Sequence, residues 1–338
     1  MSSKSPSCEF KFSVSDPTVD LGGKRTQQDC GIEYCTDTWC MVGVFDGHGK
    51  DGFSNAAAAA AKMFISEEGF YERLVETPES TANHLFDTMQ TANFDFVISK
   101  LEKKNVEFKI KNGFIDVMNL GHLRGGTTAT LVFVDNTGLL TTLNVGDSDA
   151  WMYSKTSAVK LIANHYPENP AEYDRLMLIE GTQCVYDNPQ LNCTVVPLST
   201  TSVHGQEPLT PFYVCSVDNK PATLVRFTNK GRVHTIAMTR SIGDENLREG
   251  GVISTPSISQ HQLTGDVVIK VASDGYWDAI KSADELLATN DALGRFGYAA
   301  NELVSDWFVT TKEESEKLFG CVGDNMWGYV VTVQQGTV

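Results

Sequence analysis

The chain has 338 residues, of which 41% are hydrophobic and 21% charged, a composition that excludes an intrinsically disordered protein. Its formal net charge of −16 argues against a nucleic-acid-binding surface, which needs clustered lysines and arginines. Its apolar stretches are far shorter than the ~20 residues of a membrane helix, and residues 1–16 lack the apolar core of a secretory signal. We therefore expect a soluble protein that binds neither nucleic acid nor membranes.

The predicted elements of the first half are two strands and two long helices. Residues 10–16 alternate like a half-buried strand, and residues 40–46 read as a fully buried strand. The alanine-rich residues 54–69 are predicted to form a helix that Gly69 ends. Residues 80–105 have the periodicity of an amphipathic helix.

The second half returns to strands and then adds helices. Short turns separate β-rich residues 127–135, 139–147 and 150–154, which predicts antiparallel hairpins. A helix over 169–181 is followed by an irregular segment, 182–235, with some β character. Further strands and helices are predicted, in chain order, at 266–275 (strand), 283–297 (helix), 298–320 (helix) and 327–335 (strand). Strands and helices in such blocks indicate an α+β protein.

The eight cysteines show no CxxC or Cys/His spacing of the kind that binds zinc, although Cys30, Cys35 and Cys40 are evenly spaced. We expect free thiols in a reducing compartment, and so a cytoplasmic or nuclear protein. No linker rich in Pro, Gly or Ser and no repeat divides the chain. Residues 1–338 are therefore predicted to form a single domain, and we expect a monomer.

Carboxylates recur where predicted strands end or begin. Asp46, Asp147 and Asp274 end strands, and Asp324 precedes one. Each is flanked by Gly or Ser, so each taken singly is consistent with an ordinary turn. Taken together, carboxylates gathered at one edge of a sheet would repel one another unless a cation lay among them. Mg²⁺ and Mn²⁺ prefer such oxygen ligands, so the pattern indicates a site for hard cations.

His48 lies two residues after Asp46, between two glycines. It is either a partly exposed turn histidine or a proton donor beside the metals, because imidazole is well suited to proton transfer near neutral pH.

Read in order, these motifs resemble the metal-dependent serine/threonine protein phosphatases of type 2C. The resemblance extends from about residue 20 to about residue 333 and rests on these stretches: GKRTQQD, VFDGHGK, RGGTTAT, LNVGDSDAWM, NHYPENPAEYDRL, MTRSIGDENLREGGVISTP, VASDGYWDAI and GDNMWGYVV. It implies two stacked antiparallel β-sheets flanked by pairs of helices, with metals at one edge of the sandwich. It also implies phosphorylated proteins as substrates.

The resemblance assigns roles to individual residues. Asp46 corresponds to the carboxylate that bridges two Mg²⁺ or Mn²⁺ ions, and Gly47 to the residue that offers its carbonyl. Asp274 and Asp324 correspond to further ligands, and Asp147 to a position linked to a third ion. A hydroxide between the metals would attack phosphorus directly, and His48 would protonate the departing serine or threonine oxygen.

The first motif departs from the family pattern. The usual Glu-Asp pair is Gln28-Asp29 here, so Asp29 is expected to hold a metal through its carboxylate and through water. The phosphate-binding arginine falls on Lys24, with Arg25 one place later. Either cation could bind phosphate, and both could equally be solvated surface charges. The 182–235 segment is longer than the usual flap and is predicted to lie near the cleft, where it would select substrates.

Three functions are compatible with these residues. The first is an active metal-dependent phosphoserine/phosphothreonine phosphatase. The second is a catalytically inactive family member that acts as a binding scaffold, which Gln28 and the displaced arginine leave open. The third, an acidic cation-buffering protein, does not explain His48 or the Lys24–Arg25 pair. Retention of all four strand-end aspartates favours the enzyme.

Overall fold

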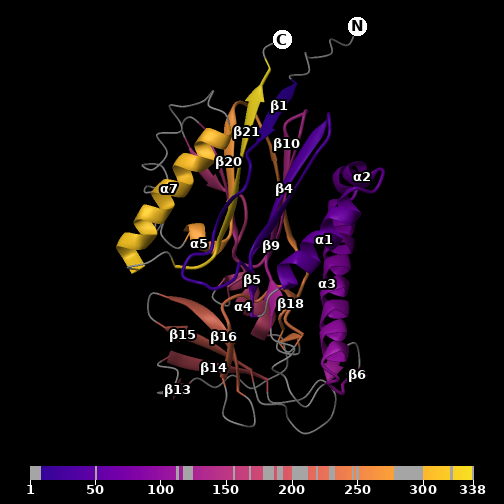
Figure 1. Cartoon of the computed structure of the whole chain (residues 1–338), viewed down its shortest axis with the longest axis vertical. Coiled ribbons are helices and arrows are strands. Elements are labelled where there is room, and N and C mark those ends of the chain that lie inside the picture. Colours follow the sequence, from indigo (N-terminus) through magenta and orange to yellow (C-terminus); the bar gives the residue numbers. More distant parts are fainter. Residues whose placement is uncertain are drawn as a thin grey trace.

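Two antiparallel β-sheets lie face to face, with helices on both outer sides (Figure 1). This is the predicted α+β sandwich. The computed structural model describes residues 9–49, 52–111, 114–116, 125–154, 157–166, 169–177, 186–188, 193–199, 212–217, 220–227, 233–245, 247–248, 251–277, 300–319 and 323–336.

The first sheet joins the N-terminal strand to the C-terminal one. Its strands lie in the order β1 (Phe10–Val14), β21 (Met326–Gln335), β20 (Val267–Ala272), β11 (Asp149–Tyr153) and β12 (Ala158–Lys160), and β2 (Thr18–Asp20) also pairs with β21. On its outer side lie α5 (Asp274–Trp277) and α7 (Ala300–Phe319) (Figure 1). Tyr276 and Trp307 from these helices pack against Val268 and Val330 of the sheet.

The second sheet carries the long helices. Its strands lie in the order β19 (Ser257–Gln262), β10 (Leu139–Val145), β9 (Ala129–Asp135), β4 (Trp39–Phe45) and β3 (Cys30–Cys35). Helices α1 (Phe53–Ile65), α2 (Phe70–Glu76) and α3 (Pro78–Lys103) cover its outer face (Figure 1). No helix among the described residues is both long and apolar enough to span a bilayer.

Strand β4 is buried along its whole length because it faces two cores. Val42 and Val44 point into the core between the sheets, whereas Met41 and Phe45 point into the core beneath α1 and α3. Burial of each such side chain contributes about 1.5–3 kcal/mol to folding. This explains why the sequence is apolar without interruption up to Asp46.

Smaller elements surround the end of the sandwich where β4 stops. Strands β5 (Gly47–His48), β8 (Gly126–Thr127) and β18 (Ile242–Gly243) form a short sheet there. Helix α4 (Pro170–Met177) lies nearby (Figure 1). Strands β6 (Lys109–Lys111) and β7 (Phe114–Asp116) form a separate hairpin.

The structure corrects two sequence predictions about these elements, and a third prediction falls outside the residues that it describes. Strands β10 and β11 do not form a hairpin: the chain crosses between sheets at 146–148, because β10 pairs with β9 and β19 while β11 pairs with β12 and β20. Gly69 precedes an unpredicted helix, α2, and the preceding helix already ends at Ile65. The helix predicted over 283–297 lies outside the described residues.

A further correction concerns the segment 182–235, predicted as irregular: its described residues, together with Ile236, form a five-stranded antiparallel sheet. Its strands, in order, are β13 (Tyr186–Asn188), β14 (Cys193–Ser199), β15 (Phe212–Val217), β16 (Lys220–Phe227) and β17 (Val233–Ile236). Figure 1 shows this sheet beyond the end of the sandwich that carries β5.

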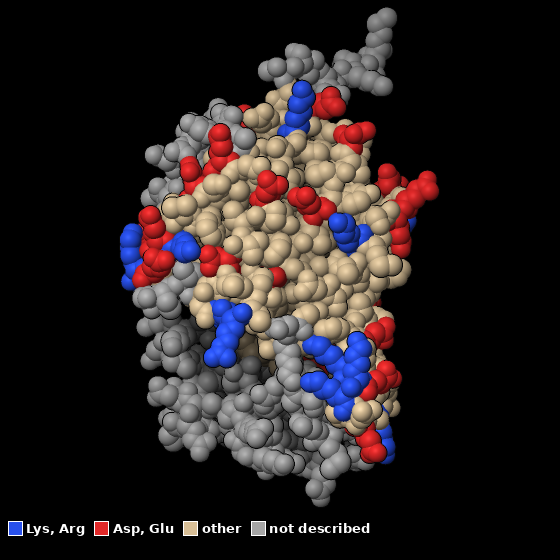
Figure 2. All heavy atoms as spheres, viewed as in Figure 1, with Lys and Arg blue, Asp and Glu red and all other residues tan. Residues whose placement is uncertain are grey.

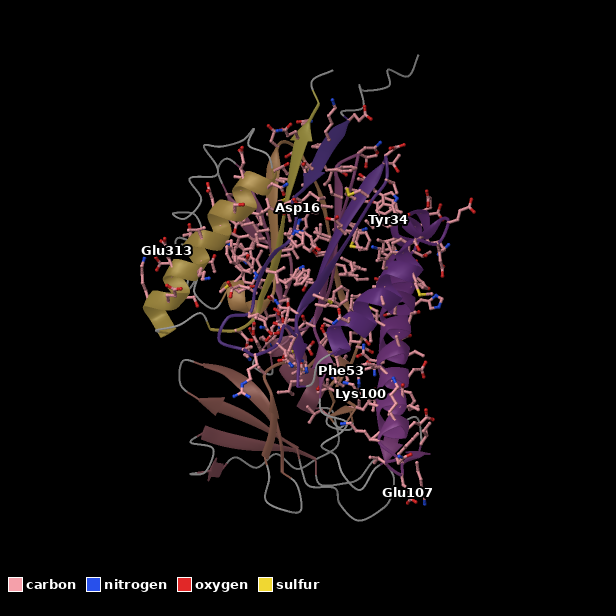
Figure 3. The ribbon with its side chains drawn as sticks, in the orientation of Figure 1. Asp16, Tyr34, Phe53, Lys100, Glu107 and Glu313 are labelled. Atoms are coloured by element: carbon pink, nitrogen blue, oxygen red, sulfur yellow. A yellow bond between two sulfur atoms is a disulfide. The ribbon has the colours of Figure 1, made fainter. Side chains whose placement is uncertain are left out.

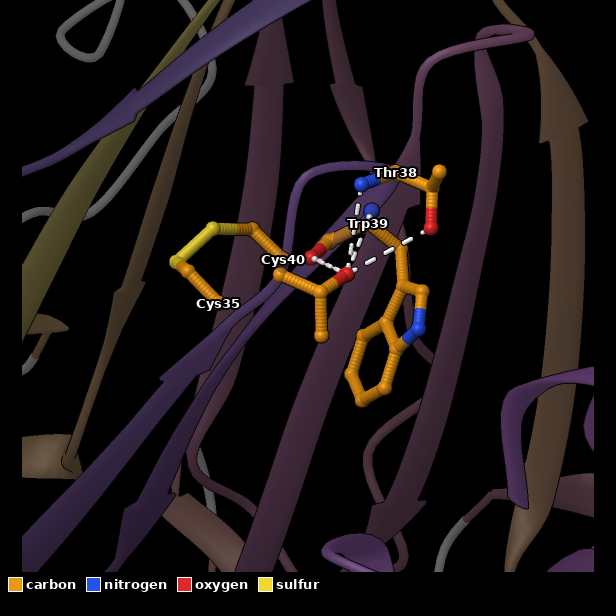
Figure 4. The surroundings of a disulfide bond; sticks show 5 residues. Cys35, Thr38, Trp39 and Cys40 are labelled. Atoms are coloured by element: carbon orange, nitrogen blue, oxygen red, sulfur yellow. Dashed lines mark hydrogen bonds between the residues drawn. A yellow bond between two sulfur atoms is a disulfide. The ribbon is translucent and has the colours of Figure 1, made fainter. Parts of the chain in front are cut away.

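The expectation of free thiols throughout is wrong for two cysteines. A disulfide joins Cys35 to Cys40 across the hairpin of β3 and β4, where the two residues lie directly opposite each other (Figure 4). The Thr36 hydroxyl accepts hydrogen bonds from the backbone N–H groups of Thr38 and Trp39 and so closes the intervening turn. Cysteine usage therefore no longer supports a reducing compartment.

Loss of this disulfide is expected to lower the free energy of unfolding by about 2 kcal/mol, because only a short loop is closed. Urea denaturation of the Cys35→Ser variant, with and without reductant, measures this loss, and reductant should lower the stability of the wild type only.

The pairing itself can be tested on one tryptic peptide, residues 26–50, which contains Cys30, Cys35 and Cys40. Alkylation of one cysteine in this peptide is expected in the oxidised protein; alkylation of all three would contradict the pairing.

Candidate active site

Strand register brings the predicted carboxylates to one edge of the sandwich. Asp29 precedes β3 and Asp46 follows β4, and the neighbouring pair Cys30 and Phe45 places these two ends together. In the other sheet, the pairing of β20 with β21 brings Asp274 near Asp324. The backbone N–H of Asp274 donates to the Asp46 carboxylate at 3.4 Å, which joins the two sheets at this point.

Burial and mutual repulsion perturb these carboxylates strongly. Burial raises the pKa of Asp46 well above its ordinary value, and the negative charges of Asp29, Asp147 and Asp324 raise it further. Burial, with repulsion from Asp274 and Asp324, likewise raises the pKa of Asp29 to about 7, although hydrogen bonds from Ser273 and Gly47 oppose the shift. Because these like charges are close together and Asp29 and Asp147 are buried, a cation among them would be strongly favoured.

The carboxylates of this cluster differ in burial. Asp29 and Asp147 are only 4% and 6% exposed, whereas Asp46, Asp274 and Asp324 are partly exposed. Figure 2 shows acidic side chains over one face of the sandwich, with basic ones among them. The cluster is therefore partly buried and partly accessible to solvent.

The donor set fits a hard divalent cation. The Oδ2 atom of Asp29 is buried and has no hydrogen-bond partner within the described part of the chain, as expected of an oxygen that awaits a ligand. Among the described residues, no group of three or more His, Cys, Asp or Glu side chains lies in position to hold a metal ion. Oxygen donors of this kind nevertheless suit Mg²⁺, which keeps several of its waters and binds through one or two carboxylates.

Gly47 allows the close approach on which the site depends. A Cβ atom at this position would lie 2.1 Å from the Gln28 carbonyl oxygen, so any side chain would push residues 27–29 away. The Gln28 backbone N–H donates to Asn325 Oδ1 at 3.0 Å, and Asn325 Nδ2 donates to the Leu21 carbonyl at 2.8 Å. Asn325 thus ties the segments carrying Asp29 and Asp324 together.

The two predicted phosphate-binding cations lie at the rim. The Lys24 ammonium contacts the Asp324 carboxylate at 2.9 Å, with both side chains about two-fifths exposed. The hydrogen bond to Asp324 raises the pKa of Lys24, and Asp274 and Asp46 raise it further. Arg25 is exposed. Lys24 therefore partly neutralises the carboxylate cluster from its solvent side.

Asp147 lies where the chain crosses from β10 to β11. The preceding Gly146 N–H donates to Nδ1 of His165 at 3.0 Å. Burial lowers the pKa of His165 to about 3, so the ring is neutral and can accept this bond. Next to this turn, the Thr128 hydroxyl accepts from the Asp46 N–H at 3.0 Å, and the Thr128 N–H donates to the Asp46 carbonyl at 2.9 Å. These bonds fix the backbone of both aspartates.

His48 forms a dyad with a residue that the sequence analysis did not single out. Its Nε2 lies 2.6 Å from Asp244 Oδ2, and Asp244 is only 4% exposed. Burial disfavours the imidazolium, but the Asp244 carboxylate and the more distant Asp147 outweigh it and raise the pKa of His48. Nδ1 of His48 is buried without a hydrogen-bond partner among the described residues.

Sequence reasoning missed the residues that position the carboxylates and the imidazole. Thr128, Ser273, Asn325 and Asp244 all lie inside the motifs already quoted, and Ser273 and Asn325 directly adjoin Asp274 and Asp324. Ser273, for example, accepts a hydrogen bond from the Trp327 N–H at 3.0 Å. Their place within the motifs was the available signal, but the partners of these side chains are far away in the chain.

The segment that carries Asp244 is anchored by a buried ion network. Glu172 of α4 accepts from Arg240 Nε at 2.9 Å and from Thr239 Oγ1 at 2.6 Å, and Arg175 Nη2 contacts it at 2.9 Å. Burial alone would raise the pKa of Glu172, but these three donors lower it to about 2. The α4 helix therefore holds the residues that lead into Asp244.

A comparison with protein-family models agrees with this geometry. The model described as protein phosphatase 2C matches residues 9–194 and 218–288. The chain belongs to the protein phosphatase 2C family. Membership assigns it to the phosphoprotein phosphatases, as the motifs predicted.

Individual relatives are distant. The probable protein phosphatase 2C 61 of Arabidopsis thaliana is 27% identical over 294 residues, which cover 83% of this chain and 74% of that protein. The serine-threonine phosphatase 2C of Toxoplasma gondii has the same fold, with a TM-score of 0.60 and 18% identity over 98% of this chain and 96% of the other. A sex-determining protein of C. elegans also shares it, with a TM-score of 0.59 and 16% identity over 95% of this chain and 64% of the other.

Glu172→Gln is expected to lower the free energy of unfolding by about 3 kcal/mol near neutral pH, because Glu172 is buried and its loss leaves two mostly buried arginines without their anion. Since the native pKa of about 2 lies below the ordinary 4.5, this contribution is complete above pH 4.5 and is lost as the pH falls toward 2.

Urea unfolding of both proteins at several pH values measures the difference, which should shrink on acidification. The matched control is Glu314→Gln, at an exposed ion pair with Lys317, where a change below about 1 kcal/mol is expected. A difference between wild type and Glu172→Gln that does not vary with pH would show that the network does not depend on the ionised Glu172.

Proposed function

We propose that this chain removes phosphate from phosphoserine and phosphothreonine in proteins, with at least two Mg²⁺ or Mn²⁺ ions as cofactors. The observation that carries the proposal is the group of buried and partly buried carboxylates contributed by both sheets around Asp46. Family membership supports the reaction class. The cost of burying these like charges supports the requirement for cations.

The residues that would hold the ions are those placed at the sandwich edge. Asp46 and the Gly47 carbonyl, with Asp274 and Asp324, are proposed to bind the principal pair, assisted by Asp29, and Asp147 is proposed to bind a third ion. When bound, such ions would supply a hydroxide, formed by lowering the pKa of a bridging water, for direct attack on phosphorus. Lys24 or Arg25 at the rim would hold the phosphate oxygens.

His48 is proposed to protonate the departing oxygen. Its Nε2 is engaged by Asp244, which leaves Nδ1 as the atom that donates the proton. The neighbouring carboxylate favours the imidazolium and so keeps this proton available. Asp244 is then a positioning residue, which fixes the ring and its protonation through one hydrogen bond.

The insertion over 182–235 is proposed to contact protein substrates. Its sheet, β13–β17, extends from the end of the sandwich that carries β5 and His48 (Figure 1). A substrate long enough to reach beyond the phosphorylated residue would meet these strands.

The purified protein is expected to hydrolyse a phosphothreonine peptide with Mn²⁺ and to lose this activity with EDTA. Asp46→Asn and Asp274→Asn should each lower turnover by at least about 100-fold, because either change removes a charged metal ligand. Phosphate release measures turnover, and Asp306→Asn on the outer side of α7 is the control. Turnover that EDTA does not affect would contradict the mechanism, and absence of turnover with metal bound would support the scaffold function.

His48→Gln is expected to slow hydrolysis of an alkyl phosphate monoester by about 100-fold. Hydrolysis of an aryl monoester should be slowed only slightly, because a phenolate leaves without a proton. Asp244→Asn should show the same preference with a smaller effect. Steady-state kcat values for both substrates measure it, with His84→Gln, an exposed histidine of α3, as the control. Equal slowing of alkyl and aryl substrates would remove the general-acid role.

A further inference from the structure

The turn that presents Asp244 to His48 has a backbone conformation that its own residues do not favour. Gly243 has φ 91° and Asp244 has φ 48°, so two successive residues are left-handed. Such a conformation is unfavourable for a residue with a side chain and persists only where surrounding contacts impose it. The position of the Asp244 carboxylate therefore depends on whatever holds this turn.

Gln90 of helix α3 supplies several of the hydrogen bonds that keep this turn in place. Gln90 Oε1 accepts the Gly243 N–H at 2.8 Å and also accepts a bond from the Arg248 guanidinium. Its Nε2 donates to Glu245 on the other side of Asp244. One amide group thus bonds to the residues immediately before and after Asp244.

Arg248 and Phe53 complete the support. The Arg248 guanidinium donates to the Gly243 carbonyl at 2.9 Å and to the Ser241 carbonyl at 3.0 Å. Phe53, the first residue of α1, lies beneath the turn, because a Cβ atom at Gly243 would lie 3.3 Å from its ring. Lys100 of α3 lies over this ring, 5.0 Å from its centroid (Figure 3). The turn is held between α1 and α3, and Gln90 supplies hydrogen bonds to both of its sides.

We propose that Gln90 is a positioning residue for phosphate-ester cleavage, which acts through the Gly243–Asp244 turn to hold the His48 imidazole in place. The proposal rests on the proposed role of His48 as proton donor. Removing the Gln90 amide would leave the Gly243 N–H and the Arg248 guanidinium short of an acceptor. The left-handed turn would then relax, and the 2.6 Å contact between Asp244 and His48 would be lost.

The test compares alkyl and aryl phosphate monoesters in Gln90→Leu, which has similar volume but no hydrogen-bonding group. We expect kcat for the alkyl ester to fall about 10-fold, as for a misplaced catalytic group, and kcat for the aryl ester to change less than about 2-fold. In the His48→Gln background the alkyl-specific loss should vanish, because both changes act through one proton transfer. Asn83→Ala, at an exposed site on the same helix, is the control.

A second variant separates positioning from general destabilisation. The double variant Gln90→Glu, Glu245→Gln exchanges the amide and the carboxylate. It keeps an acceptor for the Gly243 N–H and for Arg248, and a hydrogen bond between positions 90 and 245. Alkyl turnover is expected to recover to within about 3-fold of the wild type. Equal slowing of alkyl and aryl esters by Gln90→Leu, or persistence of the loss without His48, would overturn the proposal.

The effect of Gln90 on His48 can also be measured without an activity assay. The imidazole N–H of His48 bonded to Asp244 should give a downfield proton resonance, assigned by its absence in His48→Gln. This signal should disappear in Gln90→Leu and return in the exchanged double variant. If the wild type has no turnover at all, the proposed function fails, and this resonance alone decides whether Gln90 positions His48; its retention in Gln90→Leu would overturn the inference.

Discussion

The accumulation of negative charge at the meeting edge of two sheets is the constraint on which the rest of the structure depends. Asp46 is partly buried beside three other carboxylates, and none of the described contacts fully offsets their repulsion. Lys24 reaches only the outermost, Asp324, from a partly exposed position. In a medium of low dielectric such a group is costly unless a cation or a proton joins it. The fold therefore favours a bound cation at the place where the family's chemistry requires metals.

The surrounding structure fixes the residues at this edge in place. Two cores, one on each side of β4, fix the strand whose end carries Asp46. The Thr128 hydroxyl then accepts the Asp46 backbone N–H, and the Asn325 amide holds the loops from both sheets together. A second group, the dyad of His48 and Asp244, is held from α1, α3 and α4 by the Gln90 amide and the Glu172 network. The carboxylates are thus fixed by the sheets, whereas the imidazole is fixed by the helices.

Much of the site was predictable because strand ends in an antiparallel sandwich converge. Asp46 and Asp274 are identified from apolar runs that stop at a carboxylate, and Asp324 from its place just before a strand; the register explains their proximity. Long periodic helices such as α3 were also predicted, since their signal is local. The fold itself, two stacked sheets with flanking helices, came from the family resemblance and not from periodicity.

Features that depend on distant partners were not predictable. Periodicity cannot reveal that β10 and β11 belong to different sheets, because each looks the same whichever strand it pairs with. The disulfide needed the register that places Cys35 opposite Cys40. Asp244 escaped notice because its importance comes from a left-handed turn and a partner 196 residues away. In the 182–235 segment, weak β signals concealed an additional sheet.

The central claim is that carboxylates from both sheets bind divalent cations together. Anomalous diffraction from crystals grown with Mn²⁺ tests it most directly. The account predicts manganese peaks within ligand distance of Asp46 and of Asp274 or Asp324, so that one cluster bridges the sheets. Manganese found only at the protein surface, with Asp46 distant from every peak, would contradict it.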